Sequence, residues 1–504
     1  MILLAQKEAC SFPRASGILL PITSLPSPYG IGTLGKAAYE FVDFLKKAQQ
    51  RYWQVLPIGP TSYGDSPYQS FSAFAGNPYF IDLDTLAEEG LLQYDEINCH
   101  DWGWDAAKVD YARIFESRFT VLRKAYERSA HKSAPAYNAF CEENVFWLDD
   151  YSLYMALKFY FDNHEWSAWD EDIRLRDPKA VKAYTEKLKD DIDFWKFVQY
   201  KFFEQWNRLK AYANDNGIKI IGDIPIYVSM DSADTWVHGD MFQLDEQRRP
   251  IKVAGVPPDN FSAEGQLWGN PLYDWDAMEK DHFSWWKQRM GASAKIYDVI
   301  RIDHFIGVVK YYSIPADATT AIEGKWMPGP GAKLINAINT VLGDSLVIAE
   351  DLGVSDEKVD ALLKKSGYPG MKVLQFGFDG GNDNVFLPHN ITQNHVVYGG
   401  THDNETLVGY FCNDDKDIED LRYAVEYLGC ETIGDIPDAI IRVGFMSCAH
   451  TVIYQLQDYL GLDNSARMNF PSTLGGNWEW RAVKSQMSDK LAARIAKLVE
   501  IYGR

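Results

Sequence analysis

Short apolar segments recur along the chain, and each ends in glycine or polar residues, where a buried strand would stop. Helical periodicity lies between several of them, as at 331–341 and 356–366, and also at 35–48. Seven segments have the strand pattern: 15–20, 52–58, 218–228, 297–305, 345–353, 371–378 and 395–404. An eighth is expected near 465–471. Strands that alternate with helices pair in parallel, and eight of them can close into a ring. The chain is therefore predicted to be an α/β protein built on a (β/α)8 TIM barrel.

Two long segments interrupt this alternation. Residues 84–190 are charged, poor in glycine and helical in period, which predicts a largely helical insertion. Residues 229–290 are rich in proline and glycine and too long for a simple loop, which predicts a lid or loop subdomain. We therefore expect a single catalytic barrel over residues 1–504 with these two subdomains inserted into it.

The charge balance narrows the class of partner. The chain carries 71 Asp and Glu against 50 Lys and Arg, a net charge of −21. Such a surface repels phosphate backbones, which argues against a nucleic acid or an anionic membrane as partner. A neutral substrate suits it better. The 16 Trp and 29 Tyr mostly fill the core, but their flat rings also suit the binding of sugars.

The cysteines, the histidines and the first residues bear on location and cofactors. The six cysteines form no C-x-x-C pair, so a reducing compartment is expected. The start has only a short apolar run before Lys7 and Glu8, unlike a signal peptide, and no stretch approaches a membrane span. The ten histidines do not cluster at metal-ligand spacing. We therefore expect a cytoplasmic protein with no metal and no other cofactor.

Four of the expected strands end in a carboxylate. These are Asp223 in GDIP, Asp303 in RIDHF, Glu350 in AEDLG and Asp403 in THDN. In a TIM barrel the catalytic groups stand at this end of the strands. One such residue is more often a helix cap or a structural ion pair. Four that converge on one rim crowd like charges, which costs free energy unless a function retains them.

Two carboxylates that flank one bond can perform glycosyl chemistry, one as nucleophile and the other as acid and base. Asp303 and Glu350 lie on successive expected strands, so they could face each other across a sugar. Arg301 lies two residues before Asp303 and therefore on the same face, where its positive charge would favour the carboxylate form. His402 and Asp403 end another strand and are suited to holding sugar hydroxyls.

Over residues 14–481 the chain resembles the 4-alpha-glucanotransferases, also called amylomaltases or disproportionating enzymes, of the α-amylase clan. The motifs include YGDSPYQSFSAFAGNPYFID, AGVPPDNFSAEGQLWGNPLY and RMNFPSTLGGNWEWR. The matching segments are 18–35, 63–82, 222–228, 254–273, 301–305, 348–353, 370–376, 400–406 and 467–481. So many long motifs in one order are very specific to this family.

The resemblance implies a role for each matching residue. Asp303 corresponds to the nucleophile, Glu350 to the acid/base and Asp403 to the third carboxylate that holds the donor ring. The matching donor-site ligands are Asp223, Arg301 and His402. Residues that line the cleft are Tyr68, Asp259, Gln266 and Trp268, the last three on a flexible loop. One departure is Ile306, where the family has arginine three residues after the nucleophile.

Three functions follow from these residues. The first is an intracellular transferase that moves α-1,4-glucan segments to glucose or to another glucan through a glycosyl-enzyme. The second is a retaining glucan hydrolase on the same scaffold, and the third is a glucan-binding protein without catalysis. The loop at 254–275 favours a covered cleft and hence transfer. The resemblance is compatible with a location in a plastid as well as in the cytoplasm.

Overall fold

The computed structural model describes residues 12–504 apart from 63, 259–261, 354–355 and 414–415. Its centre is an eight-stranded sheet of parallel neighbours in the order β10-β11-β12-β1-β2-β3-β6-β9. The strands are β1 (Ala15–Leu19), β2 (Tyr52–Gln54), β3 (Lys219–Pro225), β6 (Val299–Asp303), β9 (Leu346–Ala349), β10 (Gly370–Val373), β11 (His395–Tyr398) and β12 (Thr451–Gln455). A hydrogen bond of 3.0 Å from Ala349 N to Pro369 O joins the two ends of this order. The sheet thus closes into the predicted (β/α)8 barrel.

Seven of these strands lie within the segments that the sequence predicts, except that β10 begins one residue earlier, and most of them end several residues before the predicted segment does. The eighth strand lies elsewhere. It is β12, whose residues are all buried and pair with β1 and β11. Residues 465–471 instead complete a short 3-10 helix and continue as a loop. The run TVIYQ follows the apolar helix α18 (Ile436–Met446) after only four residues, so the two merge into one apolar stretch in the sequence. Its pairing with β1 identifies it as a strand.

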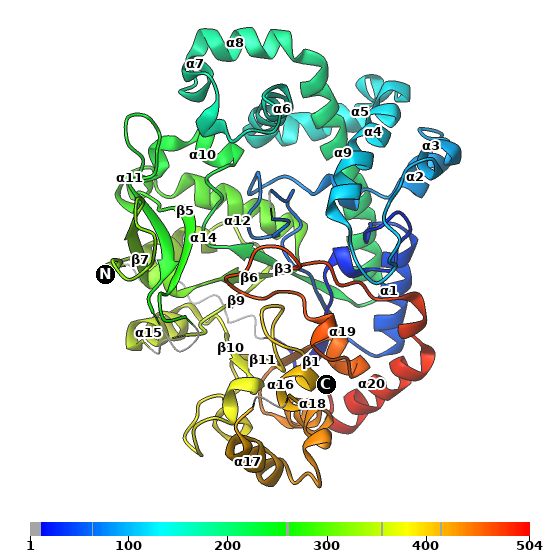
Figure 1. Ribbon diagram of the computed structural model, residues 1–504, viewed down its shortest axis with the longest axis vertical. Helices are drawn as coiled ribbons and strands as arrows, with labels where there is room; N and C mark the ends of the chain where they lie inside the picture. The colour runs from blue at the N-terminus through cyan, green and yellow to red at the C-terminus, as the bar shows by residue number, and fades with distance from the viewer. Residues whose placement is uncertain (1–11, 63, 259–261, 354–355, 414–415) are drawn as a thin grey trace.

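Helices surround the barrel (Figure 1). The helices predicted at 35–48, 331–341 and 356–366 are confirmed as α1 (Lys36–Lys47), α14 (Ala332–Asn339) and α15 (Glu357–Ser366). The others in the barrel are α12 (Ser284–Ile296), α13 (Ile306–Val309), α16 (Leu407–Phe411), α17 (Ile418–Leu428), α18, α19 (Leu456–Leu460) and α20 (Asp489–Tyr502).

Helices also fill the segment between β2 and β3 and lie above the barrel in Figure 1. They are α2 (Leu83–Glu88), α3 (Tyr94–Asn98), α4 (Tyr111–Arg128), α5 (Pro135–Glu143), α6 (Val145–Tyr160), α7 (Glu171–Arg174), α8 (Pro178–Lys187) and α9 (Lys189–Asp215). α9 leads back to the barrel: its side chains Phe202, Trp206 and Leu209 are buried, and Gly217, with a φ of 79°, lets the chain turn into β3.

A smaller antiparallel sheet lies beside the barrel, in the order β5-β4-β7-β8. Its strands are β4 (Lys252–Val256), β5 (Gln266–Pro271), β7 (Lys310–Pro315) and β8 (Lys325–Pro328), with α10 (Ala233–Val237) and α11 (Trp275–Lys280) nearby in sequence. Two of these strands come from beyond residue 290. The division into a helical insertion at 84–190 and a lid at 229–290 stays a proposal.

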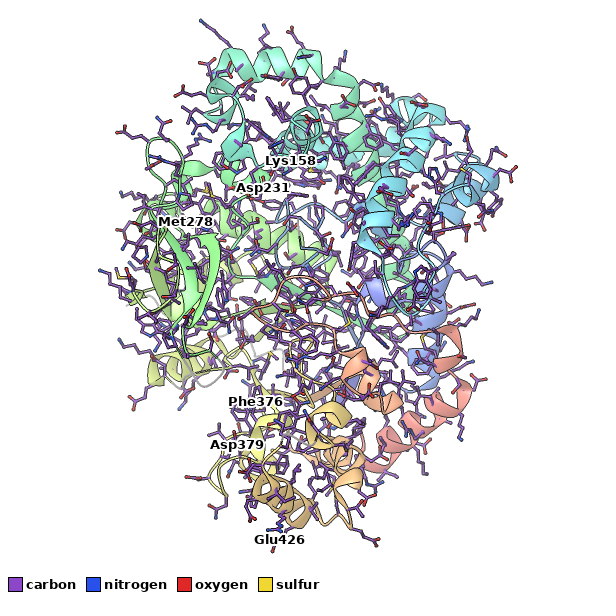
Figure 2. All side chains as sticks on the ribbon, viewed as in Figure 1. Lys158, Asp231, Met278, Phe376, Asp379 and Glu426 are labelled. Carbon is purple, nitrogen blue, oxygen red and sulfur yellow. The ribbon has the colours of Figure 1, made fainter. Side chains whose placement is uncertain are left out.

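The helical region is tied to the barrel by an ion pair between a buried lysine and a partly buried aspartate. Lys158 of α6 and Asp231, in the segment after β3, lie together in Figure 2, with 2.6 Å between Nζ and Oδ2. Lys158 is 3% exposed, and Tyr154 OH also donates to Asp231. Because a buried charge is costly without its partner, this pair holds the two regions in one arrangement.

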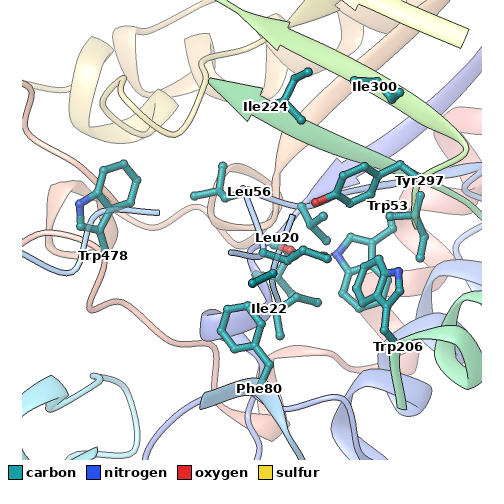
Figure 3. Packing of buried hydrophobic residues seen from close by; sticks show 14 of the residues in the cluster. Leu20, Ile22, Trp53, Leu56, Phe80, Trp206, Ile224, Tyr297, Ile300 and Trp478 are labelled. Carbon is teal, nitrogen blue, oxygen red and sulfur yellow. Dashed lines mark hydrogen bonds between the residues drawn. The ribbon is translucent and has the colours of Figure 1, made fainter. Parts of the chain in front are cut away.

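The apolar core runs from the barrel strands into the flanking helices. Ile224 of β3 and Ile300 of β6 belong to the same cluster of buried residues as Trp206 of α9 (Figure 3). The indole N–H of Trp206 donates to Ile296 O, and that of Trp53 donates to Leu20 O. Over the described parts of the chain, no helix is both long and apolar enough to cross a membrane.

Candidate active site

The four predicted carboxylates come together at one end of the barrel. Asp223 lies in β3, Asp303 is the last residue of β6, and Glu350 follows β9 directly. These three strands are neighbours in the sheet and run in parallel, so their carboxyl ends share one edge. Asp403 lies in the loop after β11.

Arg301 is the charged centre of this group. Its Nη1 donates to both oxygens of Asp223, at 2.7 and 2.6 Å, and to Oδ1 of Asp303 at 2.9 Å. Both Arg301 and Asp223 are buried. Burial raises the pKa of Asp223, and Arg301 opposes that shift. Burial acts to lower the pKa of Arg301, but the carboxylates of Asp223 and Asp303 raise it above its ordinary value. The guanidinium group therefore stays protonated.

Glu350 is held in a different environment. Its Oε2 accepts a hydrogen bond from His304 N and its Oε1 one from Leu352 N, both at 2.7 Å. Burial raises the pKa of Glu350 to about 7, against the opposing charge of Arg301. At neutral pH this carboxyl can therefore both donate and accept a proton, which is the property of a general acid and base.

Asp403 is held on both of its oxygens. His402 Nε2 lies 3.3 Å from Oδ2, and Asn469 Nδ2 donates to Oδ1 at 2.7 Å. Although burial acts to raise it, the pKa of Asp403 lies below its ordinary value because of His402 and Asn469. Arg467 donates to the main-chain oxygen of Asp403 at 2.8 Å. The third carboxylate is thus fixed as an anion.

Asn469 and Arg467 were not among the predicted site residues. They belong to the segment 465–471 that the sequence assigns to the eighth strand, and the structure corrects this to a loop that reaches Asp403. The signal was present in the motif RMNFPST, which the family resemblance includes without assigning these residues a role.

Tyr68, which the sequence predicts to line the cleft, contacts two of the predicted donor-site residues, Asp223 and His402. Its hydroxyl donates to Asp223 Oδ2 at 2.8 Å, and its ring stacks on that of His402 with 5.1 Å between the centroids. His402 is 1% exposed, and among the described residues its Nδ1 has no hydrogen-bond partner. A polar atom of this kind is available to a ligand.

Gln266 and Trp268 lie on the strand β5 rather than in a loop, which corrects one expectation. They face the same way because strand residues alternate, and the indole N–H of Trp268 donates to Gln266 Oε1 at 3.1 Å. The Trp268 ring meets the His304 ring edge to face, at 4.8 Å. Asp259 lies outside the described residues.

His304 is a further residue that sequence reasoning missed. Strand alternation places it away from Asp303, but its φ of 51° is left-handed and ends the alternation. Its main chain thereby bonds Glu350, and its ring lies against Trp268. Burial lowers the pKa of His304 to about 4, so the imidazole is neutral at pH 7. No group of three or more His, Cys, Asp or Glu within the described ranges is placed to hold a metal ion.

Comparisons with known proteins agree on one family. The family model described as 4-alpha-glucanotransferase matches residues 20–485. The 4-alpha-glucanotransferase of Clostridium butyricum is 50% identical over 484 residues, which cover 96% of this chain and 99% of that protein. That of Streptococcus pneumoniae is 48% identical over 493 residues, 97% of each chain. The solved amylomaltase from Streptococcus agalactiae in complex with acarbose is 43% identical, with a TM-score of 0.94 over 97% of this chain and 99% of that one.

Proposed function

The chain belongs to the 4-alpha-glucanotransferase family and is an enzyme of that activity, and from this premise we propose that it transfers α-1,4-glucan segments by a retaining double displacement at Asp303 and Glu350. One observation carries the mechanism. Arg301 contacts Asp303 directly, while Glu350, which follows the neighbouring strand β9, has a pKa raised to about 7. Two carboxyl groups in environments that differ in this way suit the separate tasks of nucleophile and acid.

In the first half of the reaction, Asp303 attacks the anomeric carbon of the donor glucan. The bond between this carbon and the glycosidic oxygen breaks, and Glu350 gives its proton to that oxygen. The leaving glucan departs with a new hydroxyl, and the donor segment stays attached to Asp303 as an ester. Glu350 is left as a carboxylate.

In the second half, a hydroxyl of the acceptor sugar attacks the same carbon. Glu350 takes the proton from this hydroxyl, the new glycosidic bond forms, and the Asp303 carboxylate leaves. Two inversions at one carbon leave the α configuration unchanged. Glucose and the ends of other α-1,4-glucans are the proposed acceptors.

The remaining polar residues hold the donor ring. Asp403 is clamped by His402 and Asn469, and its oxygens can accept hydrogen bonds from hydroxyls next to the reacting carbon. His402 Nδ1, Asp223 and Arg301 complete the proposed donor site, with Tyr68 stacked over His402. Contacts that become stronger as the donor ring distorts stabilise the transition state, and so they lower the free-energy barrier to cleavage of the glycosidic bond.

Transfer requires that a sugar compete with water for the glycosyl-enzyme. Trp268 and Gln266 on β5 are the proposed acceptor contacts, together with Asp259. Trp268 stands against His304, one residue from the nucleophile, which supports a role at the acceptor side. A bound and oriented acceptor gains an effective concentration that free water does not have.

The experiment that tests this function is incubation with maltotriose alone. Transfer predicts glucose and a ladder of longer glucans with no net increase in reducing ends. A steady rise in reducing ends would instead identify a hydrolase, and no change in maltotriose, despite its binding, would identify a glucan-binding protein.

We also propose that the enzyme works in the cytoplasm, with α-glucans as its partners and no nucleic acid or membrane. The described cysteines, Cys99, Cys141, Cys412, Cys430 and Cys448, are all free, which supports a reducing compartment. Fractionation of the native cells, or of plastids where they exist, tests this location.

A further inference from the structure

A surface groove of about 560 Å³ lies in the helical region, between α4, α6 and the first turns of α9. None of the site residues described above lines it. Its size is within the range of pockets that bind small molecules or short chain segments. The groove therefore has room for a ligand separate from the active site.

Aromatic rings form the floor of the groove. Phe119 and Phe159 lie 5.3 Å apart, and Trp195 lies 5.4 Å from Phe119 and 5.3 Å from Phe159, measured between ring centroids. Trp195 is buried, but Phe159 and its neighbour Tyr160 are 39% and 42% exposed. Exposed aromatic side chains that cluster at a groove often mark a binding site.

The rim of the groove is polar and balanced in charge. Arg123 and Lys124 contribute two positive charges, and Glu127 and Asp191 two negative ones. Arg123 is paired with Asp190 and Asp191 while its guanidinium covers the ring of Phe194. Such a rim offers hydrogen-bond donors and acceptors without selecting a charged ligand.

We propose that this groove binds α-1,4-glucan chains. A glucan is neutral, presents apolar sugar faces to aromatic rings and directs its hydroxyls to a mixed polar rim, which are the features the groove complements. The inference rests on the proposed function, because it takes the ligand from the substrate class of the active site.

The helix α9 connects the groove to the barrel. The first turns of α9 carry Asp191 and Trp195 at the groove. Further along α9, the side chain of Gln199 forms hydrogen bonds with the main chain of Gly76, and the side chain of Gln205 does the same with the main chain of Asp82. A polymer held in the groove is thus held at a fixed place on the catalytic molecule. Its free ends then reach the active site at a raised effective concentration.

The test compares a polymer with a short donor. The double variant Phe159→Ser/Tyr160→Ser removes the exposed rings, and Thr120→Arg fills the groove from α4 with no loss of core packing. Tyr94→Ser, at an aromatic side chain of similar exposure on α3, is the matched control. We expect both groove variants to raise KM for glycogen roughly two- to tenfold, the worth of one or two aromatic contacts. The kcat/KM for maltotriose should stay unchanged, as should all values for Tyr94→Ser.

A readout without catalysis separates this inference from the proposed function. In native gels that contain glycogen, the parent protein should be retarded and both groove variants should migrate faster. Equal retardation of parent and variants would overturn the proposal, even if maltotriose is disproportionated normally. A change in molecular mass in solution, without a change in retardation, would show that the groove is a contact between copies of the chain and would also overturn it.

Discussion

Asp303 is the residue on which the proposed chemistry depends most directly. Replacing it with asparagine keeps its size but removes the attacking oxygen anion, so no glycosyl-enzyme can form. We expect Asp303→Asn to lower kcat for maltotriose disproportionation by at least about 10³-fold. Thermal unfolding of the variant provides the control, because the fold should persist. Turnover near that of the parent would remove Asp303 from the nucleophile role.

Glu350 sets the pH dependence of the first half-reaction. Burial raises its pKa to about 7, so the protonated form that donates to the leaving oxygen is present below pH 7 and is lost as the pH rises through it. We expect kcat/KM for maltotriose to fall about tenfold per pH unit well above 7. An α-maltosyl fluoride donor, whose fluoride leaves without a proton, should lack this decline in the glycosylation step. The same decline with both donors would contradict the assignment of Glu350 as the acid.

Trp268 is the residue expected to separate transfer from hydrolysis. Its ring lies against His304 beside the nucleophile, where an acceptor sugar would stack. We expect Trp268→Ala to lower transfer severalfold more than hydrolysis, since one ring contact is worth about 0.5–1.5 kcal/mol. The measurement is the ratio of reducing ends released to segments transferred. If both rates stay intact, Trp268 does not bind the acceptor.

At the scale of elements, the loop from β11 to α16 carries His402 and Asp403 and is braced by Asp458 of α19. Asp458 Oδ1 accepts a hydrogen bond of 2.8 Å from Leu407 N, the first residue of α16. A Cβ added to Gly399, at the start of the loop, would lie 3.4 Å from Oδ2. The buried carboxyl group of Asp458 thus holds the end of the loop at Leu407 and leaves little room for a side chain at Gly399.

This brace predicts a pH-dependent stability. Burial raises the pKa of Asp458 to about 7, whereas in the unfolded chain it is about 3.9. The folded state therefore holds the proton between pH 4 and 7, where the unfolded chain has lost it, and stability falls as the pH rises through this window. Asp458→Asn keeps an acceptor for Leu407 N but cannot ionise, so its Tm relative to the parent should rise from pH 5 to pH 8. Between pH 5 and pH 8 the gain in unfolding free energy relative to the parent is at most about 2.7 kcal/mol, because about two pH units of the window lie in this range. A Tm difference that is the same at both pH values would show that Asp458 does not titrate in this range.

At the scale of the whole molecule, the helical region and the barrel depend on each other through Lys158 and Asp231. The segment that contains Asp231 also holds the loop of Tyr68: Ala73 N donates to Asp234, and Ala233 N donates to Phe71 O. A change in the helical region can therefore reach the donor site through two short connections.

We expect Lys158→Met to reduce the free energy of unfolding by about 3–5 kcal/mol, because it leaves the Asp231 carboxylate without its buried partner. Lys196→Met is the matched control, since its pair with Asp149 lies nearer the surface and should change stability by less than about 1 kcal/mol. Denaturant unfolding of the two variants measures the difference. Equal effects would show that the Lys158 pair does not join the two regions more strongly than a surface pair.

Much of the molecule follows from local sequence pattern alone. Apolar runs bounded by glycine or polar residues placed seven barrel strands, and the carboxylates at their ends, Asp223, Asp303, Glu350 and Asp403, could be named as one group. The four residues could be grouped because the parallel strands of a barrel all end at the same rim. The position of a residue along its strand therefore indicates which residues of other strands lie near it. The roles of these residues remain proposals, as does the role of Asp259, which lies outside the described residues.

Only the tertiary structure decided the contacts that depend on distant segments. The strand Thr451–Gln455 is distinguished from the helix before it by pairing with β1, which lies more than 400 residues earlier in the chain. Asn469 reaches Asp403 from a loop, and His304 turns toward Trp268 through a left-handed φ, and neither leaves a periodic signal. Sequence periodicity reports which residues a segment buries. It does not report which segment buries them, because that is decided by closure of the barrel and by the hydrogen bonds that closure makes possible.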